Sequence, residues 1–594
     1  MKKFTIILFI VSVFCCPAFS NAQKYYTVQS DQWQMVNDIC QLAGVSGPSS
    51  NGPLTATQLL AALNRAESVL KGSIPEVEEV KRDLSANRGL FGDGISFLSI
   101  SPFLNVEGYF QSNPHDTPKW GNSIVDPDAE WLIKDSLSRR PVLGVEGEMG
   151  ISDFFYGRIE YSFIQNDYVE GIWNSSFSHN LSNLFSQNFP YDSGVSIGNR
   201  HISVIAAKGR RSIGRGFTGN TAIGDVYNYQ EYLKAGVFSD FLGVILAVTN
   251  FDSSNDISMT GNPFDVLGSR FSGNKTLRYE SSIEWNFFEK FSYSITMITL
   301  EDSDGGIDLR AFNPFYIMHN MFNFGEGKKE ILEANNMLTM DFSLTPFEKW
   351  NLYFQFTIDQ SQTADEVAAY VIYPGYVDPD AKGYLANISY VDRLGNGIFR
   401  AYAEFVYNSP GLYLAEVYYS PSGALTHLRK TDGNPNPRCW ALDYLIGYHR
   451  VSQNGDDVTF SGYRFGPDVI VGAIGFRYTE YDKLTLDARL MYMAHGEKGR
   501  GTDIRNYSFD GIDSPSTYDS LAPTGIVEHA VACTVELRCR PFAFVETYVG
   551  LEYSYRWNYM NVDGLHDQNL KFAVGAKVSA EIKDIYELFA GAGK

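Results

Sequence analysis

The chain has 594 residues and a formal net charge of −21. Proteins that bind nucleic acids carry basic patches that neutralise phosphates, so this acidity excludes nucleic acid as an expected partner. The aromatic content of 14%, the 53 glycines and only six cysteines exclude a disulfide framework and favour many short strands joined by turns.

Residues 1–22 have the pattern of a secretory signal peptide. A basic start, MKK, precedes the apolar run FTIILFIVSVF, and small residues follow in SNA, so we expect cleavage after Ala22. The run is too short to span a bilayer as a helix. The pair Cys15-Cys16 also allows a lipoprotein signal, but Phe14 stands where such signals usually have a small residue.

Residues 23–90 are predicted to form a small helical bundle. DQWQMVNDICQLA has apolar residues at helical spacing and is followed by Gly44, which can end a helix. ATQLLAALNRAESVL repeats that spacing, with Thr55 or Thr57 as its N-cap, and a third helix starts near Pro75. Three helices of this size bury little surface alone, so we expect them to pack on the rest of the chain as a periplasmic plug.

The stretch GRRSIGRGFTGNTAIGDVYNYQ (209–230) contains G-x-G-x-x-G at Gly214, Gly216 and Gly219. That pattern can mark a dinucleotide site, but no βαβ unit surrounds it and an exported chain meets few nucleotides. We therefore interpret it as a glycine-rich turn whose glycines let the backbone pass where side chains would clash, and we expect no cofactor.

From residue 91 to residue 594 the apolar period becomes two. The clearest stretches are NLYFQFTIDQ (351–360), KLTLDARLMYM (483–493), AFVETYVGLEYSYRW (543–557) and LKFAVGAKVSAEI (570–582). They are longer than average soluble strands and match the alternating segments of outer-membrane barrels. We predict an all-β transmembrane antiparallel β-barrel of about eighteen strands with long extracellular loops. A soluble β-sandwich or propeller is the alternative.

Five stretches follow, in order, the pattern of one known family. They are SDQWQMVNDICQLAGVSGPSSNGPLTATQLLAAL, AKGRRSIGRGFTGNTAIGDVYNYQEYLKAGVFSDFLGVILAVTNFD, DLRAFNPFYIMHNMFNF, ANNMLTMDFSLTPFEKWNLYFQFTIDQ and GYRFGPDVI. Together they resemble the outer-membrane capsule-assembly proteins of the Wzi family. The family's Trp-Gly-Pro-Gly is represented here by Ile213-Gly214-Arg215-Gly216. The resemblance implies an eighteen-stranded barrel behind a helical bundle, a lectin-like role and no catalysis.

The candidate polysaccharide-binding residues are arginines and flat aromatic side chains in or beside predicted loops. Aromatic rings can stack on sugar rings, and guanidinium groups can pair with uronate carboxylates. The candidates are Arg210, Arg211, Arg215, Trp120, Trp131, Trp173, Tyr191, Trp440 and Tyr518. An alternative places the arginines in ion pairs with Asp and Glu inside the barrel, and the aromatic residues in loop packing or at the membrane interface.

No motif for catalysis or metal binding accompanies these candidates. Neither G-x-S-x-G nor H-E-x-x-H occurs, and no Cys/His cluster has zinc spacing, so we expect neither an enzyme nor a metal site.

The first hypothesis is a monomeric, helix-plugged outer-membrane barrel, contacting outer-membrane lipids and inserted by the barrel-assembly machinery. It would associate non-covalently with surface or capsular polysaccharide, acidic polymers included, and help its assembly or attachment at the cell surface. The second hypothesis is a passive porin-type channel for small solutes. The third is a secreted soluble β-rich adhesin or enzyme. Filling of the lumen distinguishes the first two, and dependence on detergent distinguishes the third.

Overall fold

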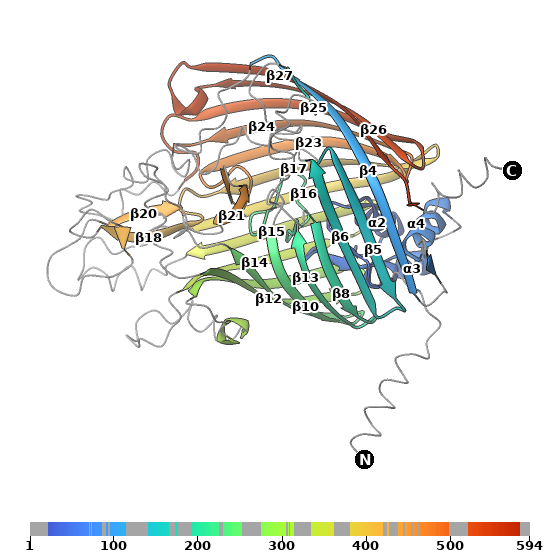
Figure 1. The fold of residues 1–594 in the computed structure, drawn as a ribbon. Helices are drawn as coiled ribbons and strands as arrows, with labels where there is room; N and C mark the ends of the chain where they lie inside the picture. The colour runs from blue at the N-terminus through green and yellow to red at the C-terminus, as the bar shows by residue number, and fades with distance from the viewer. Residues whose placement is uncertain are drawn as a thin grey trace.

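The computed structural model of the chain gives a β-barrel with helices at one mouth (Figure 1). The residues that it describes are 22–70, 72, 74–85, 91–92, 96–113, 141–164, 173–175, 192–224, 230–251, 275–303, 307, 309–313, 334–360, 381–419, 425–426, 438–442, 446–452, 455–460, 462–497 and 521–582. Residues 1–21 of the predicted signal peptide (1–22) lie outside these residues, so the signal peptide stays a prediction.

Eighteen long antiparallel strands form a closed barrel within the described part of the chain, which confirms the predicted fold class. In chain order they are β4 (Ser96–Gln111), β5 (Leu143–Ile151), β6 (Phe155–Ile164), β8 (Asp192–Gly198), β9 (Ile202–Gly209), β10 (Gln230–Phe238), β11 (Leu242–Phe251), β12 (Lys275–Phe287), β13 (Phe291–Ser303), β14 (Ala334–Leu344), β15 (Trp350–Gln360), β16 (Ala381–Leu394), β17 (Gly397–Asn408), β23 (Val469–Glu480), β24 (Leu484–His495), β25 (Glu528–Phe542), β26 (Val545–Trp557) and β27 (His566–Ser579). The barrel closes where β27 pairs with β4, with Val574 opposite Gly108.

Short and long connections alternate around the barrel. Eight connections, among them those from β5 to β6 and from β14 to β15, span two to five residues. Because neighbouring strands are antiparallel, all eight lie at the same end, which we call the short-turn end. The opposite end carries the longer connections, and one of these, between β17 and β23, contains the small strands β18 (Leu414–Tyr419), β19 (Leu425–Thr426), β20 (Arg438–Leu442), β21 (Ile446–Ser452) and β22 (Gly455–Phe460).

Burial on the strands is inverted relative to a soluble protein. Along β26, Leu551 is 45% exposed while its neighbour Glu552 is 1% exposed. The same alternation holds on β15, where Leu352 and Phe354 face outward and Gln355 is buried. Soluble proteins rarely expose such continuous apolar surface, whereas a transmembrane barrel presents it to lipid. The barrel is therefore a membrane-spanning one, and a soluble sandwich does not fit.

The apolar outer surface extends to the tips of the short turns. Large exposed side chains stand at these turns in several places around the rim: Phe154, Phe241, Phe288, Phe347, Leu394 and Phe544. Such residues fit the boundary between the hydrocarbon and the polar headgroups better than open water does. The short-turn end therefore lies at a membrane interface.

Three helices precede the barrel: α2 (Asp31–Ala43), α3 (Ala56–Val69) and α4 (Pro75–Ser85). Ser30 caps α2 by accepting a hydrogen bond from the backbone N–H of Trp33, and Gly44 ends it in the left-handed conformation, as predicted. Thr55 is the N-cap of α3, and its backbone N–H donates to the side chain of Gln58. None of the helices in the described residues is long and apolar enough to cross a membrane.

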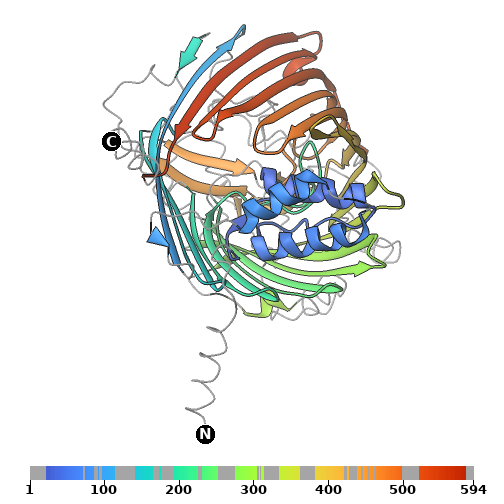
Figure 2. The same cartoon turned by 90° about the vertical axis from the view of Figure 1, so that its right-hand side faces the viewer.

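The helices sit across the short-turn mouth of the barrel (Figures 1 and 2). Their shared apolar core also takes in Val391, Ile398 and Tyr481 from the rim of the barrel wall. On another side, strand β1 (Tyr25–Tyr26) pairs with β2 (Leu54–Thr55) and places Tyr25 against Tyr156 of β6. The bundle thus completes its core by packing on the barrel. Its periplasmic location remains a prediction.

Candidate functional site

The glycine-rich stretch predicted as a turn folds into the lumen. We call its described part, residues 210–224, the infolded segment. It contains no helix in the described part, which agrees with its interpretation as a turn. Ile213 makes backbone bridges to Asn51 and to Ile223, so the segment doubles back on itself beside the N-terminal region. A Cβ on Gly216 would lie 1.7 Å from the carbonyl oxygen of Gly219, so only glycine fits there.

Arg211 fixes the start of the infolded segment. Its fully buried guanidinium forms an ion pair with Glu280 of β12, which also pairs with Arg278. It further donates to Asn51 Oδ1 at 3.0 Å and to the carbonyl oxygen of Gly52 at 3.2 Å. The interpretation of Arg211 as a lumenal ion-pair residue is confirmed, because its charge joins the segment, the N-terminal region and the barrel wall.

Arg215 and Arg210 have different surroundings. Arg215 donates to Asn37 Oδ1 at 2.7 Å and lies 5.6 Å above the ring of Trp33, so it joins the segment to α2. It also donates to the carbonyl oxygen of Pro48. Arg210 is half-buried directly after β9. Arg211 and Arg215 therefore contact the N-terminal region from within the lumen, although the connection from β9 to β10 that carries them starts at the long-connection end.

Glu404 of β17 holds the tip of the infolded segment. Its carboxylate accepts the backbone N–H groups of Phe217 and Thr218, both at 2.7 Å, and the Thr218 hydroxyl. Asn387 of β16 donates to the same carboxylate at 3.2 Å. A buried carboxylate that accepts several hydrogen bonds is well satisfied, and removing it would leave two buried N–H groups without an acceptor. The tip is thus tied to the wall five strands away from β12, which holds Arg211.

Gln355 of β15 ties down the rest of the segment. Its side-chain oxygen accepts the backbone N–H of Thr221 at 2.7 Å and the Thr221 hydroxyl at 2.8 Å. Its side-chain nitrogen donates to the carbonyl oxygen of Ile213 at 3.2 Å. With Glu280 and Glu404, this places the anchors on β12, β15 and β17, so the segment lies along a broad arc of the inner wall.

Sequence reasoning found the segment but missed its anchors. Glu280, Gln355 and Glu404 stand at polar positions of alternating strands, and alternation alone shows that they face the lumen. Nothing in the order of residues shows which of many lumenal side chains they contact. The pairing requires the closed barrel, because the partners are up to 187 residues apart in the chain.

The helices hold the wall through a second set of polar contacts. Arg400 of β17 forms a buried ion pair with Asp38 of α2 and donates to Gln34 at 2.8 Å. Burial raises the pKa of Asp38, and the neighbouring Arg400 opposes this shift. Arg477 of β23 lies 3.1 Å from Asp31 at the start of α2. A hollow of about 180 Å³ lies beside these arginines, between α2, the infolded segment and the wall.

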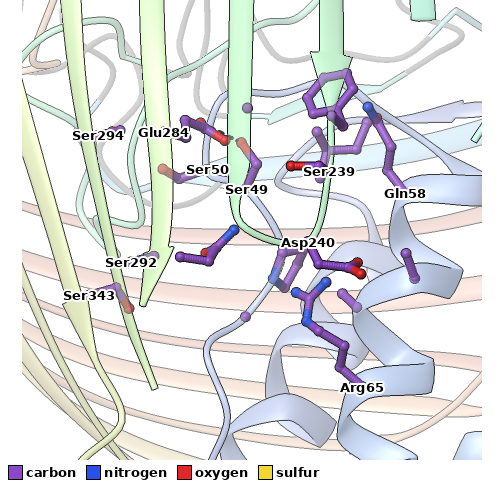
Figure 3. Close-up of a pocket in the computed structure, with 18 of the residues that line it drawn as sticks. Ser49, Ser50, Gln58, Arg65, Ser239, Asp240, Glu284, Ser292, Ser294 and Ser343 are labelled. Atoms are coloured by element: carbon purple, nitrogen blue, oxygen red, sulfur yellow. Dashed lines mark hydrogen bonds between the residues drawn. The ribbon is translucent and has the colours of Figure 1, made fainter. Parts of the chain in front are cut away.

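A larger cavity of about 410 Å³ lies between α3 and the wall formed by β10–β14 (Figure 3). Serines and glycines line much of it, together with Glu284 and Asp341 from the wall and Arg65 from α3. Figure 3 shows Arg65 and Asp240 reaching toward each other from the helix and from a short turn. Its volume falls within the range of about 300–1,000 Å³ that is usual for small-molecule sites.

The aromatic candidates do not join this group in the described structure. Trp120, Trp131, Tyr191 and Tyr518 lie outside the described residues. Trp173 belongs to β7 (Trp173–Ser175), where it pairs with Phe110 of β4, and Trp440 belongs to β20 in the long connection before β23. The role of all nine candidates in binding polysaccharide stays a prediction. Among the described residues, no cluster of three or more potential ligands could hold a metal.

Comparisons with known proteins concern the fold only. No protein family is matched by the chain, and no curated protein matches it. Among solved structures, Wzi, a carbohydrate-binding outer-membrane β-barrel involved in group 1 capsule assembly in Escherichia coli, aligns with a TM-score of 0.49 at 12% identity, over 92% of this chain and 97% of Wzi. OprD of Pseudomonas aeruginosa gives 0.35 at 8%, over 83% and 97%. The channel DcaP of Acinetobacter baumannii gives 0.32 at 11%, over 83% and 99%.

Proposed function

We propose that the chain is an outer-membrane barrel that holds surface polysaccharide non-covalently and does not act as an open solute channel. The observation that carries this proposal is the infolded segment. It is buried and charge-paired within the lumen, while the helices lie across the short-turn mouth. Because the segment occupies the lumen, we expect the ligand to bind at the surface of the barrel rather than in its interior.

The membrane assignment rests on the inverted burial of the strands. Leu551 and its outward neighbours need a hydrocarbon environment, and a closed barrel leaves no free sheet edge within it. Closed antiparallel barrels with short turns at one end and longer loops at the other are typical of outer membranes. In that arrangement the long connections face outward and the helices face the periplasm.

The proposal that the ligand is a polysaccharide rests on the resemblance of the sequence motifs to the Wzi family. In this arrangement the long-connection end would contact the polymer, and Trp173 and Trp440 belong to strands near those connections. Arg211 is occupied by Glu280, so we expect it to support the barrel interior rather than the polymer. We further propose that the chain acts as a monomer and without catalysis.

The solute channel is the competing function, and one observation favours it. Charged pairs line the inner wall on the side opposite the anchors of the infolded segment, including Lys577 of β27 with Glu146 of β5 at 2.6 Å. Charged lumenal walls are a feature of water-filled barrels. Conductance therefore separates the two functions.

The test uses the purified mature chain in planar bilayers and on a glycan array. We expect no steady open-channel steps, together with binding to at least one polymer in a set containing alginate, hyaluronan and dextran. A variant with residues 212–223 replaced by a short Gly-Ser linker is the control, because it should conduct if the segment fills the lumen. Large steps from the unmodified chain would favour the channel, and failure to bind any polymer would reject the polysaccharide role.

A further inference from the structure

The cavity beside α3 lies over two rows of lumen-facing residues that are in register across the wall. Gly243, Glu284, Ser294 and Asp341 are successive cross-strand partners from β11 to β14. The next lumen-facing row runs from Asn286 to Ser292 and Ser343. Gly243, Ser294 and Ser343 carry small side chains, so they leave open the space that α3 then covers.

The floor of the cavity offers one open acceptor. Asp341 accepts hydrogen bonds from Tyr353, from Gln355 at 2.9 Å and from Ser294 at 3.3 Å, so its carboxylate is occupied. Glu284 is held from one side, because its Oε1 accepts from Ser49 at 2.6 Å. Its Oε2 has no hydrogen-bond partner among the described residues, and it lies 3.5 Å from the position that a Cβ on Gly243 would take.

The rim adds groups of both charges. Arg65 from α3 and Asp240 from the turn between β10 and β11 point toward each other in Figure 3, and neither side chain makes an ion pair or hydrogen bond among the described residues. Around the whole cavity, the guanidinium groups of Arg65, Arg200 and Arg215 are matched in number by the carboxylates of Asp240, Glu284 and Asp341. The lining therefore offers no excess of either type of charged side chain to a charged ligand.

We propose that this cavity binds the end of a neutral saccharide, one or two sugar rings in size. Adjacent ring hydroxyls can donate to Glu284 Oε2 and to Asp240 and can accept from Arg65, so both kinds of rim group are used. Serine hydroxyls along the wall supply further donors and acceptors, while Leu60 and Phe238 offer apolar surface to the sugar face. The volume of about 410 Å³ suits a ligand of this size.

This site goes beyond the proposed function, because it lies at the short-turn end and the polymer is proposed to bind at the opposite end. A saccharide reaching it comes from the compartment that the helices face. The two proposals therefore concern different ligands at different mouths, and each can fail without the other.

The test measures binding of small sugars to the full mature chain in lauryldimethylamine oxide, a detergent without a sugar headgroup. The neutral probes are maltose, lactose and diacetylchitobiose, and the charged probes are glucuronic acid and glucosamine. Saturation-transfer NMR and calorimetry should detect at least one neutral probe and weaker or no binding of the charged probes. Absence of binding by all three neutral probes, or tighter binding of the charged ones, would overturn the proposal.

Two variants locate the binding. Ser343→Leu fills the hollow and should abolish binding, while Glu284→Gln keeps the shape and exchanges an acceptor for a donor, so it should weaken binding by about tenfold. Ser99→Ala, on β4 outside the cavity, is the control and should bind like the unmodified chain. Heat-modifiable gel migration checks folding, and if Ser343→Leu does not fold, Glu284→Gln decides alone. Equal affinity in the cavity variants would place the sugar elsewhere and reject the site, whereas polymer binding on the array should be unchanged in them.

Discussion

Two pieces of chain enter the barrel, and they are held in opposite ways. The helical bundle has an apolar core of its own, built from Val36, Ile39, Leu59 and Leu63 and completed by rim residues of the wall. The infolded segment brings several buried polar side chains, such as Arg211, Thr218 and Thr221, and its contacts are hydrogen bonds and ion pairs to the wall.

The difference shows that a membrane barrel reverses the usual arrangement of an apolar interior and a polar surface. Its apolar side chains face lipid, so the interior is polar and a segment can fill it without apolar residues of its own. The stability of such a segment depends on each buried charge having its partner, because an unpaired buried charge is strongly destabilising. The bundle depends instead on filled apolar volume. Substitutions in the two regions should separate these two dependences.

The largest effect is expected for Glu280→Ala. It leaves the buried guanidinium groups of Arg211 and Arg278 without their carboxylate, a loss of about 3–5 kcal/mol by analogy with other broken buried pairs. The infolded segment should detach while the strands stay paired. Limited trypsin digestion measures this, because Arg211 and Arg215 become cleavable. Equal resistance of the variant and the unmodified chain would show that the ion pair does not hold the segment.

Leu63→Ala should weaken the bundle and spare the segment. Leu63 is fully buried in the helical core, and such a truncation costs about 2–5 kcal/mol. The readout is alkylation of Cys40 in a variant that lacks the other cysteines. Burial raises the pKa of the Cys40 thiol from 9.0 to about 12, so at pH 8 the folded protein holds it protonated and unreactive.

The pH dependence of Cys40 has a defined sign. The folded state keeps its proton between pH 9 and about 12, where the unfolded chain loses it, so this contribution to stability is present below pH 9 and is lost as the pH rises through that window. Because Leu63→Ala weakens the bundle that buries Cys40, this variant should speed alkylation of Cys40 at pH 8. Trypsin resistance at Arg211 should be unchanged. Loss of both protections together would mean that bundle and segment unfold as one unit.

Ser30→Ala tests the local start of the bundle. It removes the acceptor of the Trp33 backbone N–H at the N-terminus of α2, which typically costs about 1 kcal/mol. Alkylation of Cys40 should rise less than in Leu63→Ala, and the Ser30→Asp variant should restore protection because aspartate also caps helices. An effect as large as that of Leu63→Ala would show that α2 unfolds from its end.

Lys483→Ala should have the smallest effect. Lys483 lies 3.7 Å from Glu79 of α4, but its side chain is 63% exposed, so the pair is screened by water and contributes at most about 1 kcal/mol. Neither trypsin resistance nor Cys40 alkylation should change measurably. A clear change in either would mean that the bundle is docked by surface charge rather than by its apolar core.

The sequence by itself determined the elements that repeat a simple pattern. Alternation along residues 543–557 and 570–582 predicted strands β26 and β27, and helical spacing with Gly44 and Pro75 predicted the bundle. These predictions succeeded because each depends on neighbours within a few residues. Residues 171–200 are rich in Asn and Ser and predict a long loop, but β8 covers Asp192–Gly198 near the end of that stretch, where apolar alternation is weak.

Only the tertiary structure decided what the lumen contains. The sequence indicated that glycines 214, 216 and 219 form a turn, but not that this turn folds inward to meet Glu404 and Gln355. The cavity beside α3 was equally hidden, since Ser292 and Ser343 become neighbours only through strand register. The physical reason is that polar lumen residues are interchangeable in sequence, and closure of the barrel alone selects which of them meet.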